Sequence, residues 1–447
     1  MSTPPRGPSP RTKGVLIGIV ALLLCGLAGL GAYWLTHRRH PHKPVKGSAT
    51  TEFSTTTTEQ KPRPKKLIKT LPWPTYGYDL ARTRYAPEFT ERPPYRALWR
   101  HGAGNYIEFP PVVAHGRIYV TQLFGRFLAL DARTGKLLWT RKFRRCSPSS
   151  PTYGKGIVYQ AYIPLPCSNA SRSSRNGFIV AFDARTGHEL WRRAGISSES
   201  SVLLVGHLLY FGSWDHKVYA LNVNTHRVAW TYTTDAEVNS SPAYSNGTIY
   251  IGTDGGSVYA LGALRGKLRW RAGGGSEYFY ATPAVAYGRV FIGNTDGTMF
   301  SFGARTGHLL WAQPAGSYVY SPAAVWNRTV YVGSYDGYFR AFDAATGDLR
   351  WKFNAPSSIH GAPTVINGIV YFSTCGLCGH NGSRGAKLGA NVTFGLNART
   401  GREVWSWPDG KYSPIVADTK RVYLVGRTRV WALVPKRRSP AARQARP

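Results

Sequence analysis

Side chains that could bind a ligand or exchange a proton gather in six short segments, each ending in proline. The segments are residues 104–111, 235–242, 276–283, 316–322, 357–363 and 410–414. Their candidate binding residues are Glu108, Glu237, Asn239, Tyr278, Tyr280, Tyr318, Tyr320, His360 and Tyr412. Tyrosine offers a rigid apolar ring with a polar tip, which suits contacts with peptides or sugars. The alternative role of these segments is to pack the neck of the fold.

Carboxylates in the same segments raise the possibility of acid–base or metal chemistry. Glu108, Glu237 and Glu277 could approach one another, but the sequence does not give their separation. Glu237 and Asn239 supply the carboxylate and amide oxygens that calcium prefers. Because no further ligand set or catalytic pattern accompanies them, we expect no catalytic residue and no metal ligand.

Four of the five cysteines form two pairs along the chain. Cys146 is followed by Cys167, and Cys375 by Cys378. Each pair lies in an unusually long repeat, so a disulfide that ties down an insertion is the favoured interpretation. Disulfides persist in oxidising compartments, which indicates a location outside the cytoplasm.

Other chemistries remain open for the second cysteine pair. A zinc site would have to recruit His360 and His380, a redox role is conceivable, and the two pairs could also exchange partners. A c-type haem requires histidine directly after the second cysteine, and Gly379 separates Cys378 from His380. Haem attachment is therefore disfavoured.

These residues are carried by a repeat that residues 334–353 show most clearly. Asp336-Gly337 predicts a two-residue hairpin with positive φ, and residues 338–342 alternate as a half-buried strand. Asp343 predicts a turn, and a second strand carries Trp351, eight residues further on. Asp254 and Asp296 also precede glycine, which favours a turn role for them.

The tryptophans give the period of the repeat. From Trp99 onward the successive spacings are 40, 52, 39, 40, 41, 40 and 54 residues, through Trp139, Trp191, Trp230, Trp270, Trp311, Trp351 and Trp405. A period near 40 with several strands per unit is typical of a β-propeller. We expect each tryptophan to pack against the neighbouring blade.

Strand counts predict eight blades and a particular closure. The strands on either side of the first hairpin each occur eight times, but only seven tryptophan strands follow them. The eighth, at residues 95–99, precedes the first full repeat. We therefore expect residues 95–99 to pair with residues 430–433. The predicted fold is an all-β, eight-bladed propeller of four-stranded antiparallel blades at residues 71–435, with one N-terminal transmembrane helix.

The N-terminal region predicts that helix. Residues 1–13 are polar and are expected on the cytoplasmic side, and residues 14–35 carry no charge. As a helix, this run would be about 33 Å long, which is enough to span a bilayer. A cleaved signal peptide is the alternative. The expected location is the cell membrane, with a single span and the propeller on the extracytoplasmic side.

Two segments read as flexible and basic. Residues 36–70 are rich in Pro, Thr and Lys and predict a disordered linker, and residues 436–447 predict a loose tail.

The whole chain has 57 Lys and Arg against 22 Asp and Glu, a net charge of +35. This excess favours anionic partners such as lipid headgroups or acidic envelope polymers, or else simply solvates the outer strands. No nucleic-acid motif is present, and the oligomeric state is not readable.

The Asp-Ala-x-Thr-Gly-x-x-x-Trp blocks resemble the PQQ-like β-propeller repeat family. That family includes quinoprotein alcohol dehydrogenases and the propeller lipoprotein of the outer-membrane barrel assembly machinery. Residues 73–87, WPTYGYDLARTRYAP, also resemble the segment that opens quinoprotein dehydrogenase propellers. The resemblance implies eight blades over roughly residues 71–434.

The resemblance leaves two kinds of function. The dehydrogenases use pyrroloquinoline quinone, calcium and an aspartate base, and many carry two adjacent cysteines beneath the cofactor. This chain has no adjacent cysteine pair, so we carry over no cofactor residue and expect no cofactor. We expect a non-catalytic binding or scaffold module for envelope proteins or polymers. A quinone-dependent dehydrogenase and a ligand-sensing propeller are the alternatives.

Overall fold

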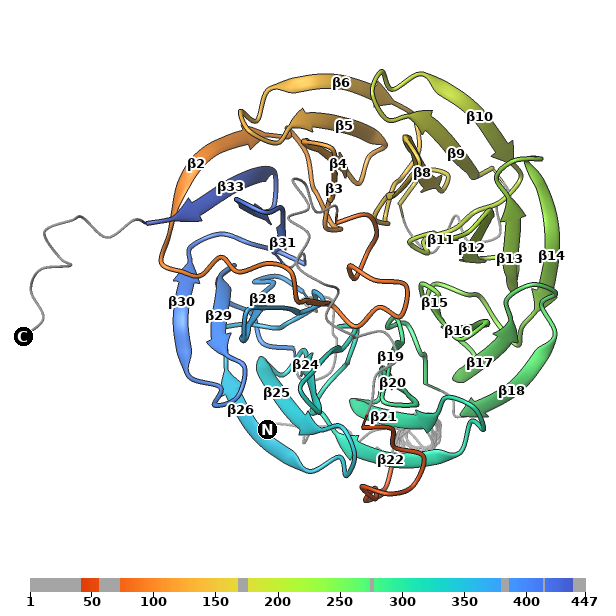
Figure 1. The fold of residues 1–447 in the computed structure, drawn as a ribbon, viewed down its shortest axis with the longest axis vertical. Coiled ribbons are helices and arrows are strands. Elements are labelled where there is room, and N and C mark those ends of the chain that lie inside the picture. Colours follow the sequence, from red (N-terminus) through yellow and green to blue (C-terminus); the bar gives the residue numbers. More distant parts are fainter. Residues whose placement is uncertain are drawn as a thin grey trace, which may run out of the picture. The chain divides into compact units, whose positions relative to one another are not determined.

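Eight antiparallel sheets stand around a common axis in the part of the chain that the structure describes (Figure 1). A computed structural model describes residues 42–55, 73–167, 176–273, 277–378, 386–412 and 415–436. Each sheet has four antiparallel strands, and one has an added fifth strand. The prediction of an all-β propeller with eight blades is confirmed.

The first four blades follow the chain in order. Blade 1 contains β3 (Val112–Ala114), β4 (Arg117–Thr121), β5 (Arg126–Asp131) and β6 (Leu137–Lys142). Blade 2 contains β7 (Thr152–Gly154), β8 (Ile157–Tyr162), β9 (Phe178–Asp183) and β10 (Glu189–Ala194). Blade 3 contains β11 (Leu203–Val205), β12 (Leu208–Ser213), β13 (Lys217–Asn222) and β14 (Arg227–Thr233). Blade 4 contains β15 (Ala243–Ser245), β16 (Thr248–Gly252), β17 (Ser257–Gly262) and β18 (Leu268–Gly273).

The last four blades complete the ring. Blade 5 contains β19 (Ala284–Ala286), β20 (Arg289–Gly293), β21 (Thr298–Gly303) and β22 (Leu309–Pro314). Blade 6 contains β23 (Ala324–Trp326), β24 (Thr329–Gly333), β25 (Tyr338–Asp343) and β26 (Leu349–Asn354). Blade 7 contains β27 (Thr364–Ile366), β28 (Ile369–Ser373), β29 (Thr393–Asn397) and β30 (Glu403–Trp407), with β1 (Tyr85–Ala86) added. Blade 8 contains β31 (Val416–Ala417), β32 (Val422–Val425), β33 (Arg429–Pro435) and β2 (Tyr95–Gly102).

Blade 8 joins the two ends of the propeller. Its outer strand β2 pairs antiparallel with β33, with Ala97 opposite Leu433 and His101 opposite Val430. The predicted pairing of residues 95–99 with residues 430–433 is therefore confirmed. A closed ring leaves no long unpaired sheet edge between its first and last blades.

Each repeat's tryptophan packs across a blade boundary, as expected. The indole of Trp139 donates to the carbonyl of Ala184 in the next blade at 3.1 Å, and that of Trp311 donates to Ala344 at 3.1 Å. The glycine of the next turn makes room for the ring: a Cβ on Gly187 would lie 2.5 Å from Trp139. The Asp-x-x-Thr-Gly turn and the preceding tryptophan thus form one packing unit.

The predicted turn role of Asp343 is also observed, but the hairpin before it differs. The Asp343 carboxylate accepts hydrogen bonds from the backbone N–H groups of Ala345 and Thr346. The hairpin between β24 and β25 spans residues 334–337, and in it only Gly337 has positive φ. It is therefore a four-residue connection and not the expected two-residue one.

Ser-Pro sequences line the neck of the ring. The Ser150 hydroxyl donates to the Pro110 carbonyl at 2.8 Å, and the Ser321 hydroxyl donates to Gly361 at 2.8 Å. The backbone N–H of Ser201 donates to the Ser241 hydroxyl at 2.9 Å. These bonds connect successive blades near the axis, which gives the segments a structural role whatever else they do.

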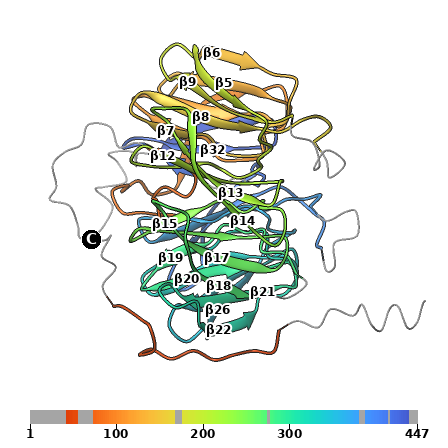
Figure 2. The ribbon, with the colours of Figure 1, turned by 90° about the vertical axis from the view of Figure 1, so that its right-hand side faces the viewer.

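Residues 73–86, which we call the plug, cross the ring at one end. Backbone N–H groups at the centre of six innermost strands donate to plug carbonyls: Val113 to Trp73, Tyr153 to Pro74, Tyr244 to Leu80, Val285 to Ala81, Val325 to Thr83 and Val365 to Arg84. Blade 3 is reached through Arg82, whose guanidinium donates to Ser201 at 3.2 Å. The plug lies at the face toward the viewer in Figure 1 and at the left in Figure 2.

Residues 42–55, which we call the strap, lie against the outside of blades 5 and 6 (Figure 2). Val45 pairs antiparallel with Ala312 of β22, and the N–H of Gly47 donates to Thr346 at 2.9 Å. We expected this stretch to be part of a disordered linker, and its backbone bonds to the ring differ from that expectation. The rest of the 36–70 range lies outside the described residues.

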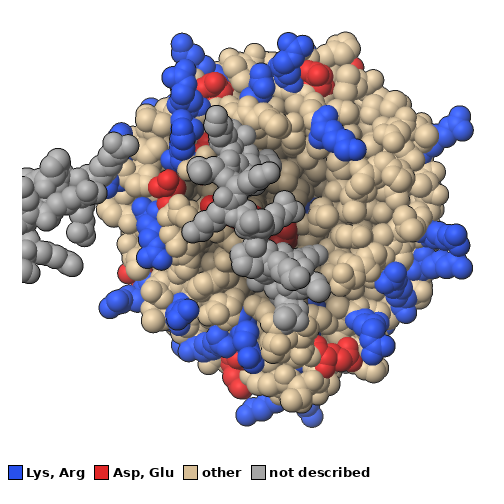
Figure 3. Space-filling model, viewed as in Figure 1, with Lys and Arg blue, Asp and Glu red and all other residues tan. Residues whose placement is uncertain are grey.

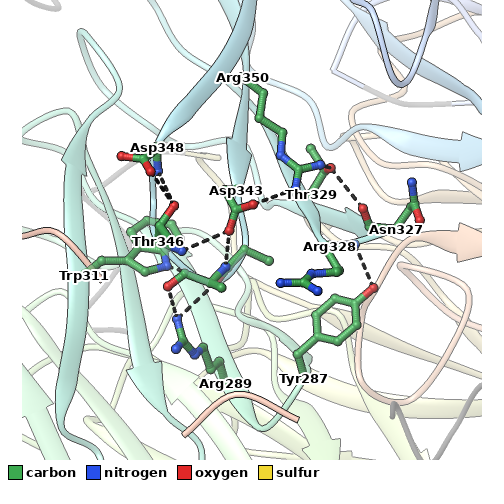
Figure 4. A network of polar contacts seen from close by, with 12 residues as sticks. Tyr287, Arg289, Trp311, Asn327, Arg328, Thr329, Asp343, Thr346, Asp348 and Arg350 are labelled. Carbon is green, nitrogen blue, oxygen red and sulfur yellow. Dashed lines mark hydrogen bonds and ion pairs between the residues drawn. The ribbon is translucent and has the colours of Figure 1, made fainter. Parts of the chain in front are cut away.

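Arg289 fixes the strap to the ring, and Figure 4 shows the bonds that its guanidinium makes to the blade 6 turn. Its guanidinium donates to the strap carbonyls of Ser48, Thr51 and Glu52 and to the carbonyls of Ala344 and Ala345 in the blade 6 turn. The ring of Phe53 covers the guanidinium, 5.0 Å from its central carbon. Five carbonyl acceptors satisfy this fully buried cation, so its desolvation is offset by charge-assisted hydrogen bonds.

The strap also completes two turns whose sequence departs from the repeat. Blade 5 has Gly303 where the repeat has Asp, and the Glu52 carboxylate occupies that space and accepts from the Thr306 hydroxyl at 2.7 Å. In blade 1 the same hydroxyl bond runs from Thr134 to Asp131 at 2.7 Å. Blade 6 has a small Ala345 where blades 1, 2, 5 and 7 have Arg, and Gly47 of the strap packs onto it. The strap thus replaces a carboxylate that the repeat lacks.

The N-terminal membrane span cannot be compared with the structure. Residues 14–35 lie outside the described residues, as do residues 1–13 and most of the tail at 436–447. Among the described residues, no helix has the length and apolarity needed to cross a bilayer.

Candidate functional site

The end of the ring opposite the plug, which we call the mouth, is formed by the segments that lead into the innermost strands. Six of the nine candidate residues contact a common aromatic and acidic cluster there: Glu108, Tyr280, Tyr318, Tyr320, His360 and Tyr412. They come from the entries to blades 1, 5, 6, 7 and 8. Residues distant in sequence meet here because the segments that enter the innermost strands all lie around the axis at the same end of the ring.

Tyrosine rings form the centre of the cluster. The ring of Tyr320 lies 5.3 Å from Tyr280, 5.9 Å from Tyr318 and 5.2 Å from Tyr335, measured between centroids. Tyr335 comes from the hairpin between β24 and β25. Aromatic pairs in tilted or edge-on contact hold one another in place, so the cluster presents a rigid surface.

His360 is held inside this cluster. Its ring stacks on Tyr320 at 5.4 Å, meets Tyr412 edge-on at 4.8 Å, and its Nδ1 lies 2.5 Å from the Tyr335 hydroxyl. Burial, followed by the charge of Lys411, lowers the pKa of His360 to about 4. The imidazole is therefore neutral at physiological pH and can exchange hydrogen bonds with a tyrosine or a ligand.

Two carboxylates lie beside the tyrosines. Burial, followed by the neighbouring Glu199 carboxylate, raises the pKa of Glu108 to about 7, although Lys411 opposes the shift. Glu199 accepts a hydrogen bond from the Tyr280 hydroxyl at 2.7 Å. A carboxyl that titrates near neutrality can donate or accept a proton, and its ionised form would attract a cationic group.

Lys411 places a cation at the edge of the acidic pair. Its ammonium lies 4.6 Å from the ring centre of Tyr412 and 4.9 Å from that of Tyr106, and Arg427 lies 4.4 Å from the same Tyr106 ring. Burial lowers the pKa of Lys411, while Glu108 opposes that shift. The cluster thus offers aromatic faces, an acid pair and a basic edge together.

The Cys375–Cys378 disulfide packs against the cluster. Its two Cα atoms are 5.3 Å apart, and the cysteines contact Tyr335, with Tyr318, Tyr320 and Tyr412 beside them. The second disulfide joins Cys146 and Cys167 across 5.6 Å. Both predicted pairings are confirmed, and the two pairs do not exchange partners. His380, the possible zinc ligand, lies outside the described residues.

The three other candidate residues take different positions. The amide of Asn239 bonds to Asp254 at 2.7 Å and to Trp214 at 2.8 Å, and Glu237 lies 3.9 Å from His216. Tyr278 is 40% exposed, and its N–H donates to the Thr295 hydroxyl at 3.0 Å. The Asn239 amide is therefore paired with protein groups, and Glu237 lies beside His216.

Sequence reasoning missed four members of the cluster: Tyr106, Glu199, Tyr335 and Lys411. Glu199 precedes β11 as the other candidates precede their innermost strands, but no proline follows it to mark the segment. Lys411 and Tyr106 lie in segments already selected, beside the residues that were chosen. Tyr335 stands in a hairpin next to Asp336-Gly337, so only the alignment of repeats could have pointed to it.

Comparison with known proteins agrees with the fold. A family model described as outer membrane protein assembly factor BamB matches residues 96–237, 215–322 and 305–437. The curated 1-butanol dehydrogenase (cytochrome c) of Thauera butanivorans is 34% identical over 132 residues, covering 27% of this chain and 18% of that protein. BamB of Yersinia pestis is 33% identical over 110 residues, covering 22% of this chain and 28% of that protein. The chain thus spans less than a third of either relative's length.

Solved structures extend the likeness over the ring. The crystal structure of BamB from Moraxella catarrhalis superposes with a TM-score of 0.60 at 16% identity, covering 76% of this chain and 99% of that one. A europium-containing methanol dehydrogenase gives a TM-score of 0.64 at 15% identity, covering 80% and 90%. These likenesses show the fold alone. Because the family model covers well over half of the chain, the chain belongs to the PQQ-like β-propeller family that the BamB model describes.

Proposed function

We propose that the chain is a non-catalytic binding module of the cell envelope, anchored in the membrane by residues 14–35 and exposing its propeller outside the cytoplasm. Its mouth binds an extended segment of an envelope protein or polymer. Two intrachain disulfides support an oxidising location. The BamB relatives support a role among envelope proteins.

One observation carries the proposal. Tyrosines and acids from five blade entries converge at the mouth, whereas the plug crosses the other end of the ring. Tyrosine clusters with polar partners bind peptides and sugars because the rings add contact area at a low entropic cost. The exposed Tyr278 ring lies on the same segment as Tyr280 and extends this surface outward.

Site-directed photocrosslinking in intact cells tests the proposal. A photoreactive amino acid replaces Tyr278 at the mouth or, as a matched control, the exposed Asn224 at the turn of blade 3 on the opposite face. We expect adducts with an envelope component from position 278 only. Adducts of equal yield from both positions, or none from position 278, would contradict a binding mouth.

A quinone-dependent dehydrogenase is the second candidate, and one observation favours it. A disulfide packs beside the mouth, as adjacent cysteines do beneath the cofactor in that group, and Glu108 titrates near neutrality. The calcium ligands do not fit: among the described residues no three His, Cys, Asp or Glu side chains converge, and Asn239 is engaged elsewhere. We therefore derive no step through the quinone.

A direct assay separates the two candidates. Purified protein is mixed with pyrroloquinoline quinone and calcium, and cofactor absorbance and dye reduction with alcohols are measured. We expect neither signal above that of a Glu108→Gln variant. Dye reduction that depends on Glu108 would contradict the binding-module proposal and would support a quinone-dependent dehydrogenase.

A further inference from the structure

We propose that the face of the ring that carries the plug docks on an anionic lipid bilayer. This face is opposite the mouth, so the inference does not depend on what the mouth binds. Its docking surface is the circle of Asp-x-x-Thr-Gly turns and the first residues of the outer strands that follow them.

One exposed arginine recurs in these turns. Two residues after the turn's first position stand Arg133, Arg185, Arg305 and Arg399, in blades 1, 2, 5 and 7. Blade 4 has Leu264 at that position and carries its arginine one residue later, at Arg265; we call these five the rim arginines. Each is exposed, and no side-chain hydrogen bond or ion pair joins any of them to another described residue. Blade 6 has Ala345 at this position, where Gly47 of the strap packs; the strap also contacts the blade 5 turn, through Glu52 and Thr306.

The turns lie at the plug end of every blade. The residue after the turn's first position donates its backbone N–H to the hairpin that follows the innermost strand: Ala132 to Gly116, Ala184 to Gly156, Ala263 to Gly247 and Ala398 to Gly368. Pseudo-symmetry therefore puts the rim arginines on one circle. Figure 3 shows this face, with Lys and Arg side chains spread around its edge and few Asp or Glu among them.

An exposed aliphatic residue accompanies the turns of blades 1, 2, 4, 5, 6 and 7. Where the outer strand begins, Leu137, Leu190, Leu268, Leu309, Leu349 and Val404 are between 42% and 49% exposed, and Leu264 inside the blade 4 turn is 78% exposed. Single exposed leucines are ordinary. Four of the six lie two residues before the tryptophan of their blade, and Leu190 and Val404 lie one residue before it. Six such residues at the start of six outer strands are a repeated feature of the outer edge, close to a repeated arginine.

The combination fits a bilayer better than a linear polymer. Guanidinium groups bind phosphate with paired hydrogen bonds, and aliphatic side chains enter the boundary between headgroups and acyl chains. A flat circle of such pairs can meet a plane at all its points together, whereas a polymer would follow a groove. Attraction to the anionic surface contributes about fivefold in partitioning for each arginine near it.

The test uses the full chain reconstituted in vesicles, with Cys25→Ser to leave no free thiol in the sequence. A fluorophore is attached at His188→Cys on the rim or at Tyr278→Cys at the mouth, and quenching by brominated lipids is measured. With 30% phosphatidylglycerol we expect quenching of the rim label only, and with phosphatidylcholine alone quenching of neither. Quenching of the mouth label, or of neither label in anionic vesicles, would overturn the proposal.

Two charge variants make the test specific. Arg133, Arg185, Arg265 and Arg399 are changed to Glu in one variant. The second variant carries the same change to Glu at four residues that are exposed near the mouth: Arg126, Lys142, Arg144 and Arg193. Both variants therefore lose the same net charge. We expect the rim variant to lose more than tenfold of the quenching signal and the matched variant to lose less than threefold. Equal losses would show a general charge effect and would overturn the proposal.

An acidic polymer is the competing partner. Soluble polyglutamate is added to the anionic vesicles at low excess. If it protects the rim label from an aqueous quencher while lipid quenching is lost, the surface binds polymers and the bilayer proposal fails. A Leu264→Ser, Leu268→Ser variant should reduce lipid quenching at unchanged polymer binding if the aliphatic residues enter the bilayer.

Discussion

Glu108 is held between two opposing influences at the mouth. Burial and the Glu199 carboxylate raise its pKa to about 7, and Lys411 pulls the pKa down. A carboxyl with a pKa above its unfolded value stabilises the fold while it is protonated. That contribution is fully present below about pH 4.5 and is lost as the pH rises to about 7.

Replacement of Glu108 by Gln should therefore change how stability depends on pH. We expect the melting temperature of the variant, relative to the parent, to rise between pH 4.5 and pH 7 and then to level off, measured by calorimetry. His360 has a lowered pKa of about 4, so its contribution falls as the pH drops below about 6.5 and partly hides the Glu108 effect in the parent. A difference that stays constant with pH would contradict the assigned shift.

A pair of glycines isolates the packing of tryptophan across blades. Gly135 has φ of 71° and a Cβ there would lie 2.6 Å from Trp99, whereas Gly104 has φ of 83° with open space around it. Gly104→Ala should lower the free energy of unfolding by about 1 kcal/mol, because alanine is strained at positive φ. Gly135→Ala should cost about 1–3 kcal/mol more through overpacking. If chemical denaturation showed equal losses of unfolding free energy for Gly104→Ala and Gly135→Ala, the Trp99 indole would not be tightly packed against Gly135.

At the scale of elements, the strap supplies by a long-range contact what the blade 5 turn lacks. Glu52 accepts from Thr306 in the position that an Asp at residue 303 would fill. Glu52→Ala should cost about 1 kcal/mol, as the loss of a capping carboxylate does elsewhere. Gly303→Asp should also destabilise, because its Cβ would lie 2.0 Å from the Glu52 carboxylate.

The double variant distinguishes this replacement from two unrelated contacts. With Glu52→Ala and Gly303→Asp together, the new aspartate has room and restores the turn. We expect the double variant to be at least 1 kcal/mol more stable than the sum of the single effects, from chemical denaturation. Additive losses would contradict the interpretation that Glu52 stands in for the missing residue.

The strap and the plug also show where sequence reasoning ended. Periodic tryptophans and turns were sufficient to predict the ring, its eight blades and its closure, because each signal is local and repeated. The partners of the strap are more than 200 residues away, as Glu52 and Thr306 are, and no local pattern encodes such a pair. Gly303 and Ala345 depart from the repeat at the turns that the strap meets, but Gly262 and Leu264 in blade 4 depart from it in the same way, so these departures do not by themselves point to the strap.

The repeat pattern was sufficient to predict some residues of the mouth but not all of them. Ser-Pro and similar sequences marked where each blade begins, so Tyr320, His360 and Tyr412 could be selected from the repeat. Glu199 lacks a following proline, and Tyr335 comes from a hairpin, so neither carries that marker. The depth of burial that shifts the pKa of Glu108 arises only when the blades are assembled.

For the whole molecule, stability depends on the strand pair that joins its ends. Because β33 pairs with β2 and holds the edge of blade 8, a chain ending at residue 428 should lose that blade and melt at a much lower temperature. A chain ending at residue 436 keeps the pair and should melt as the full chain does. Calorimetry on both truncations checks this, and similar melting of both would mean that closure contributes little.

The strap precedes the plug along the chain, and this order has a mechanical consequence. A pull applied upstream of His42 would first reach the edge of blade 5, where Val45 meets Ala312. Beyond that point the three bonds from Arg289 to Ser48, Thr51 and Glu52 would have to break almost together before tension could pass further. The contacts between the strap and the ring would therefore carry a force applied to the upstream chain. The centre of the ring would bear no load until those contacts broke.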